Sequence, residues 1–96
     1  MNYLFYYKGA KVPKNKLEAE VYEYLRAGDR LPVKSEDLPR LKAAMLQQVK
    51  CLNEKYARCK PVVVNFKESA NGDVFFFVGE GDTTAFHATL LKFRNN

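Results

Sequence analysis

Cysteine, histidine, proline and glycine are all scarce in this chain. Its 96 residues include 2 cysteines, 1 histidine, 4 prolines and 5 glycines. Two cysteines are too few for a disulfide scaffold, and so little glycine and proline excludes a collagen-like repeat or a low-complexity linker. No apolar run approaches the roughly 20 residues that a membrane-spanning helix needs. We therefore expect a soluble protein of the cytoplasm that does not enter a membrane.

The chain has enough apolar residues for one core. Hydrophobic residues make up 47% of it and charged residues 28%, which is typical of a globular protein and excludes a disordered tail. A second independent core does not fit in this length. We expect a single globular α+β domain over residues 1–96.

Residue patterns predict six elements in the order β-α-α-β-β-β. Asn15 is a suitable N-cap for the first helix, with Glu18 placed as in a capping box, and Asn71-Gly72 predicts a hairpin turn. The expected elements are a strand at 2–8, a helix at 16–27, a second helix ending at Lys60, and strands at 61–67, 73–78 and 85–93. Together they predict an antiparallel sheet with two helices packed on one face, and with the first strand at an edge or beside the middle.

The second helix, which Ser35 or Asp37 can cap, has the clearest pattern in the sequence. At about 100° per residue, seven apolar side chains fall on one narrow stripe. They are Leu38, Leu41, Met45, Val49, Leu52, Tyr56 and Cys59. We expect this stripe to face the core.

The strands lack the alternation of apolar and polar residues that a sheet with one wet face should have. In the run 74–78, and in the first strand, both alternation phases are apolar. Two helices cannot easily cover both faces, so we expect the second face to meet a protein partner or a second copy of the chain. Coverage by long side chains of the chain itself is the alternative. The aromatic residues expected to bind are Phe75, Phe77 and Tyr6.

Positive charge is concentrated in two parts of the chain. The net charge is +5, residues 1–17 hold four lysines and no acid, and residues 38–67 hold seven basic residues and one acid. Those expected to bind an acidic partner, on the side of the second helix opposite the stripe, are Arg40, Lys50, Lys55 and Arg58. Such groups also neutralise phosphates whatever the sequence, so nucleic acid is an alternative partner. An ordinary solvated helix face has the same appearance.

Side chains suited to catalysis are few. The single histidine, His87, has no carboxylate beside it by strand alternation, and general acid–base catalysis needs such an orienting partner. Cys51 and Cys59 lie about 12 Å apart along one helix, too far for a disulfide, and with His87 they do not make a zinc site. We expect no enzyme, no cofactor, no metal and no small-molecule substrate.

The element order and the length resemble the small ribonuclease toxins of the RelE/ParE type. His87 and Arg94 lie near the C-terminal strand, where such enzymes keep catalytic groups. The resemblance is one of fold alone, because no motif of that family matches residue by residue and the strand at 74–78 lacks a basic residue. It implies a ribonuclease.

Three functions remain, in order of preference. The first is a small non-enzymatic binding or regulatory module, of the phage or mobile-element accessory type, that docks on a protein or nucleoprotein. We prefer it because an apolar sheet face needs a partner more than a modest basic patch does. The second is a basic nucleic-acid-binding protein, and the third is the RelE/ParE-like ribonuclease toxin.

Overall fold

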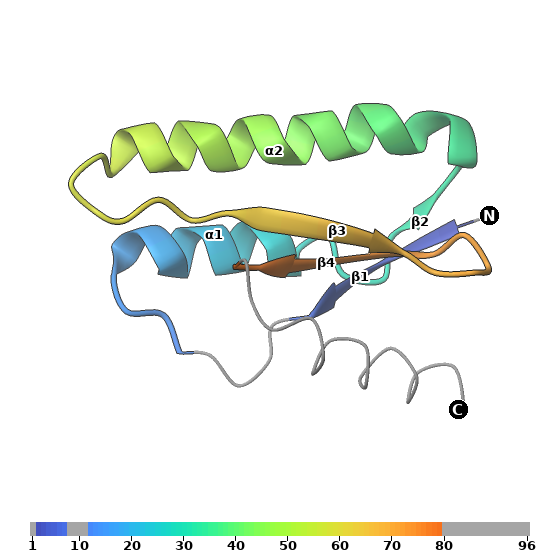
Figure 1. Ribbon diagram of the computed structural model, residues 1–96, viewed down its shortest axis with the longest axis horizontal. Helices are drawn as coiled ribbons and strands as arrows, with labels where there is room; N and C mark the ends of the chain where they lie inside the picture. Colours follow the sequence, from blue (N-terminus) through green and yellow to red (C-terminus); the bar gives the residue numbers. More distant parts are fainter. Residues whose placement is uncertain (1, 8–11, 80–96) are drawn as a thin grey trace.

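The computed structural model describes residues 2–7 and 12–79. Figure 1 shows two helices beside the strands of a sheet. In chain order the elements are β1 (Asn2–Tyr7), α1 (Lys16–Arg26), β2 (Pro32–Val33), the 3-10 turn η1 (Ser35–Asp37), α2 (Leu38–Lys55), β3 (Val64–Glu68) and β4 (Val74–Val78). The strand expected at 85–93 lies outside the described residues.

Helix α1 begins at the expected cap. The Glu18 N–H donates to Asn15 Oδ1 at 2.9 Å, and the Glu18 carboxylate accepts from the Lys14 N–H at 3.0 Å. In a capping box the second bond returns to the cap residue itself, so here it goes one residue further back. The buried side chains of α1 are Leu17, Val21, Tyr22 and Leu25.

Helix α2 carries the apolar stripe that the periodicity predicts. Its buried members are Leu38, Met45, Val49 and Leu52, and the half-buried ones packed against them are Leu41, Tyr56 and Cys59. The helix ends at Lys55, earlier than the expected end at Lys60, because Tyr56 leaves the helical region with φ −113° and ψ 52°. A turn follows, in which the Cys59 N–H donates to the Tyr56 carbonyl at 2.9 Å.

The sheet is mixed, which corrects the expectation of an antiparallel one. Its strand order is β2-β1-β4-β3. The expected hairpin joins β3 to β4, with Gly72 at φ 90° in its turn. β1 is parallel to β4, because the chain returns from α2 as β3 in the direction opposite to β1 and the hairpin then reverses it into β4. The short β2, for which no element was predicted, pairs antiparallel with β1; its Pro32 is tolerated at a sheet edge.

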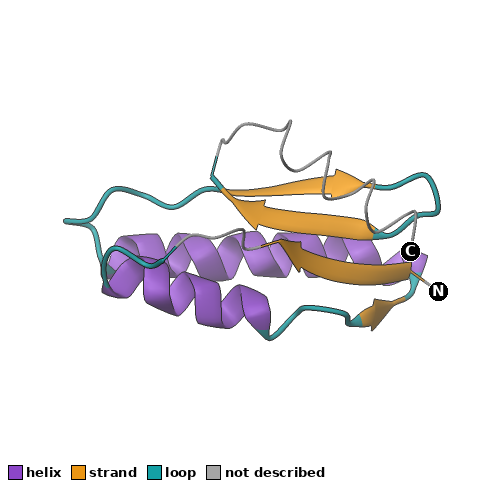
Figure 2. Ribbon diagram, turned by 90° about the horizontal axis from the view of Figure 1, so that it is seen from below, coloured by secondary structure: helices purple, strands orange, loops and turns teal. Residues whose placement is uncertain are grey.

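The register of β1 against β4 decides which alternation phase faces the helices. Leu4 lies opposite Val74, and Tyr6 opposite Phe76. These four side chains join the stripes of both helices in one core, where Leu4 is 1% and Phe76 0% exposed. Both helices lie on this face of the sheet, as expected (Figure 2).

Candidate functional site

The outer side of β3 is the part of the sheet where backbone groups remain unpaired. The Gly79 N–H donates to the Val63 carbonyl at 2.7 Å, and the Ser69 N–H to the Asp73 carbonyl at 2.8 Å. In an antiparallel ladder the residues that bond the neighbouring strand alternate with those whose N–H and C=O point away. Odd-numbered residues of β3 therefore bond β4, and the even-numbered ones point their backbone groups outward.

One outward position is closed by a side chain of α2. Asn53 donates from Nδ2 to the Val62 carbonyl and accepts the Val62 N–H at Oδ1, both at 2.9 Å. The amide thus bonds Val62 as a neighbouring strand would. For the next three outward residues, Val64, Phe66 and Glu68, no described residue supplies a partner for the outward groups. We use "open edge" for the outward backbone groups of these three residues.

Helix α2 runs along the open edge. Asn53 reaches Val62, and Lys42 Nζ lies 5.8 Å from the centroid of the Phe66 ring. Leu46 is four residues after Lys42 and seven before Asn53, so it shares their flank of the helix. Its side chain is 46% exposed, which makes it a large apolar group beside unpaired backbone.

The opposite edge of the sheet is closed. The Leu4 N–H donates to the Leu31 carbonyl at 2.9 Å and the Leu4 carbonyl accepts from the Arg30 N–H at 2.6 Å. The Asp29 carboxylate accepts the next outward N–H, that of Tyr6, at 2.9 Å. Arg30 has φ 64°, a left-handed conformation unusual for a residue with a Cβ. The loop after α1 therefore covers the edge that the two-residue β2 leaves free.

The aromatic residues expected to bind a partner lie on two different faces. Phe75 and Phe77 are on the face away from the helices and are only 6% and 7% exposed. Phe5 stacks on Phe75 with 5.1 Å between ring centroids. The second sheet face is therefore buried at its centre, and these two rings offer little surface to a partner.

Tyr6 lies on the helix face and therefore does not share a surface with Phe75 and Phe77. Strand alternation puts its ring beside Phe76, with 5.4 Å between centroids. Its hydroxyl is buried and, among the described residues, finds no hydrogen-bond partner. Burial, with a smaller contribution from Tyr22, raises the pKa of Tyr6 to about 12. Tyr6 is a core residue with an unsatisfied polar atom.

The four basic residues expected to bind do not share one free face. Arg40 pairs with Asp37 at 2.7 Å, and Lys55 with Glu20 of α1 at 3.3 Å. Lys50 is exposed on α2, while Arg58 lies in the turn beyond the end of the helix. Neither Lys50 nor Arg58 forms an ion pair with a described residue.

Lys55 belongs to a polar cluster that joins the two helices. The Tyr56 hydroxyl beside Glu20 lowers the pKa of that carboxyl, and Lys55 lowers it further against the opposing effect of burial. The pKa of Lys55 is raised by the same carboxylate. The charge of Lys55 is therefore used to join α2 to Glu20 of α1.

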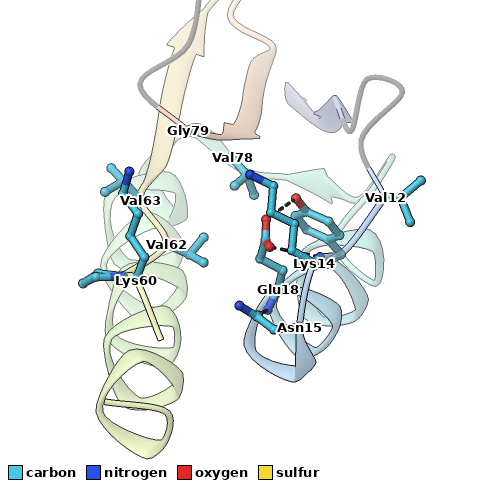
Figure 3. Close-up of a pocket in the computed structure, with 11 residues that line it drawn as sticks. Val12, Lys14, Asn15, Glu18, Lys60, Val62, Val63, Val78 and Gly79 are labelled. Atoms are coloured by element: carbon cyan, nitrogen blue, oxygen red, sulfur yellow. Dashed lines mark hydrogen bonds between the residues drawn. The ribbon is translucent and has the colours of Figure 1, made fainter. Parts of the chain in front are cut away.

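A cavity of about 670 Å³ lies between the start of α1 and the segment before β3. Figure 3 shows Lys14 and Glu18 on one side of it and Lys60 and Val62 on the other. The two Glu18 oxygens already accept from the Lys14 N–H and the Tyr22 hydroxyl, so Glu18 serves the helix start. Apart from Lys60, the side of the cavity next to β3 is lined by apolar residues and Gly79. Lys14 and Lys60 lie on opposite sides, so the lining does not bring together a nucleophile and a base.

Within residues 2–7 and 12–79, no three His, Cys, Asp or Glu side chains come together as a metal site requires. Cys51 is exposed and Cys59 half-buried, and both are free thiols. No helix in this part of the chain is long and apolar enough to cross a membrane. His87 and Arg94, the residues behind the ribonuclease resemblance, lie outside the described residues.

Comparison with protein-family models, with curated proteins and with solved structures finds no match for the chain. The open edge is the feature that inspection of the sequence missed. An asparagine near the end of an amphipathic helix, shortly before a strand, was its one signal. Asn53 carries information only once its bonds to Val62 are known.

Proposed function

We propose that this protein is a small non-enzymatic binding module that acts by stoichiometric docking on a protein partner, and that it docks through the open edge. The observation that carries the proposal is the contrast within one strand. Asn53 closes the outward groups of Val62, whereas those of Val64, Phe66 and Glu68 have no partner in the described part of the chain.

An unpaired strand edge is a template for another strand, and proteins normally shorten, cover or charge such edges. β3 has five residues, enough to bond an added strand through alternate residues, which is a recurring mode of peptide recognition. The exposed Leu46 lies beside this edge and adds apolar area next to the backbone groups. The proposed docking surface is therefore β3 and the neighbouring flank of α2, and not the aromatic rings that the sequence suggested.

The experiment is site-specific photo-crosslinking in cells that produce the full chain. A photoreactive residue replaces Glu68 on the open edge or, as the matched control, Glu36 beside the closed edge. Both glutamates are exposed. We expect a discrete crosslinked protein from position 68 and none from position 36. Equal products, or no product, at the two positions would contradict docking through the open edge.

Nucleic-acid binding is the second candidate, and one observation favours it. Lys50 and Arg58 are exposed without an ion pair to any described residue, so both charges are available to phosphates. Binding to labelled DNA and RNA should then fall steeply with salt, and Lys50→Glu with Arg58→Glu should flatten that dependence. Absence of binding at low salt, where electrostatic attraction is strongest, would remove this candidate.

A further inference from the structure

We infer that the open edge takes an extended, acidic segment of the partner protein, which adds to β3 as a strand and packs under α2. This inference rests on the proposed function and names the chemistry of the partner. Three features of the described residues carry it: the spacing of the outward backbone groups, the position of α2, and the sign of the charges around the edge.

The backbone spacing requires an extended partner. The outward groups belong to Val64, Phe66 and Glu68, which are two residues apart, and a β-strand presents its own N–H and C=O at the same interval. A helix satisfies its backbone groups internally and has none to offer at this spacing. Val62 is already bonded by Asn53, and the strand ends at Glu68. The added strand therefore bonds over residues 64–68.

The position of α2 opposes a second copy of this chain that pairs antiparallel through β3. Figure 2 shows α2 in the helix layer on one face of the sheet, and in Figure 1 it lies toward the side of β3 that faces away from β4, so it extends over the outer side of β3. Paired strands lie about 4.8 Å apart, whereas packed helices need about 8–10 Å between their axes. Two copies joined antiparallel through β3 would carry both α2 helices on one face of the combined sheet and force them closer than helices pack. A single added strand brings no such helix.

The charges around the edge select an acidic segment. α2 contributes Lys42 and Lys50 and β3 contributes Lys67, against two acids, Glu54 of α2 and Glu68 of β3. None of the three lysines forms an ion pair with a described residue.

Alternation in the added strand places its side chains. Even-numbered residues of β3 point to the helix face, where Val64 is buried and Phe66 packs on the core, so Lys67 points to the other face. Acidic residues on the face of the added strand away from the helices then lie beside Lys67, and apolar ones lie under Leu46. Lys42 and Lys50 of α2 add a longer-range attraction for the same acids. The segment should alternate between acidic and apolar residues.

The test is a titration of the isotope-labelled full chain, followed by NMR, with two capped synthetic octapeptides. One alternates valine with glutamate and the other alternates valine with lysine. We expect the glutamate peptide to shift the amide signals of Val64, Phe66 and Glu68 more than those of Asn65 and Lys67, whose N–H groups already bond β4. The lysine peptide should bind about tenfold more weakly or not at all, as reversal of several surface charge pairs predicts.

Charge variants separate attraction at this edge from attraction to the whole chain. Lys67→Glu should weaken the glutamate peptide several-fold and strengthen the lysine peptide. Lys34→Glu, an equal change at an exposed position after β2, should leave both unchanged. Equal effects of the two variants, equal binding of the two peptides, or shifts away from β3 would overturn the inference.

Photo-crosslinking from position 68 distinguishes the failure of this inference from the failure of the proposed function. A foreign protein captured through a segment that is not acidic, or a product of two copies of this chain, overturns the acidic strand and leaves docking at the open edge standing. No product from position 68, together with no peptide binding, overturns both.

Discussion

The two sides of the sheet differ in how their outward backbone groups are bonded, although β1 and β3 are similar in length, with six and five residues. At the β1 edge, a two-residue strand, the backbone of residues 30–31 and the Asp29 carboxylate bond the outward groups in turn. At the β3 edge, one asparagine bonds Val62 and the next three outward residues have no partner in the described part of the chain. An edge left unpaired beside one that is covered marks the surface available to another strand.

The largest expected difference in the free energy of unfolding is between proline variants at two neighbouring residues of β3. Lys67→Pro removes an N–H that bonds β4 and should lower the free energy of unfolding by about 3 kcal/mol. Glu68→Pro removes an outward N–H and should stay within about 1 kcal/mol, since an edge strand tolerates proline there. Urea unfolding measures both. Equal losses would mean that the outward assignment of Glu68 is wrong.

Removal of the closing amide should extend the open edge by one residue. Asn53→Ala leaves the N–H and C=O of Val62 without partners, and Val62 is 8% exposed, so we expect a loss of about 2 kcal/mol. Gln48→Ala, a change of an exposed amide on the same helix, is the control and should have little effect. If the two variants unfold at the same urea concentration, Asn53 does not close the edge.

Removal of the Asp29 side chain at the closed edge should cost less stability than removal of the Asn53 amide, because one hydrogen bond is lost instead of two. Asp29→Ala leaves the Tyr6 N–H without its acceptor and should cost about 1 kcal/mol. Asp29→Asn keeps an acceptor oxygen and should recover most of this loss. A thermal unfolding series of the three proteins measures the difference. No recovery in the asparagine variant would argue against the bond as the source of stability.

The buried hydroxyl of Tyr6 makes the stability of the fold depend on alkaline pH. The pKa of its hydroxyl is about 12 in the folded chain and about 10 when unfolded, so the folded state holds the proton more tightly. The stability that this contributes is present below pH 10 and is lost as the pH rises toward 12. Tyr6→Phe should remove this alkaline loss and also the unsatisfied hydroxyl. An unchanged alkaline slope in the variant would assign the loss to other groups.

The helices could be predicted because their signals are local. The Asn15 cap and the stripe from Leu38 to Leu52 depend on neighbours within one or two turns, and both are found in the structure. The end of α2 was missed, because the turn at Tyr56 depends on where the chain must go to enter β3.

The sheet could not be predicted to the same extent, because its pairing joins residues distant in sequence. Periodicity does not say that β1 lies parallel beside β4, and with two apolar phases it could not say that Phe76 rather than Phe75 faces the helices. The start of the open edge is set by the two hydrogen bonds between Asn53 and Val62, which cannot be predicted from the two residue types. Lys50 was selected from charge alone, and its role in binding stays a prediction. Alternation alone could not separate the face of Tyr6 from that of Phe75 and Phe77.

Amide hydrogen exchange of the free protein, resolved by NMR, tests the contrast between the two edges most directly. The account predicts fast exchange at Val64, Phe66 and Glu68 and protection at Asn65 and Lys67, whose N–H groups bond β4. It also predicts protection of Leu4 and Tyr6 at the closed edge. Uniform protection along β3, or fast exchange at Leu4 and Tyr6, would contradict the account.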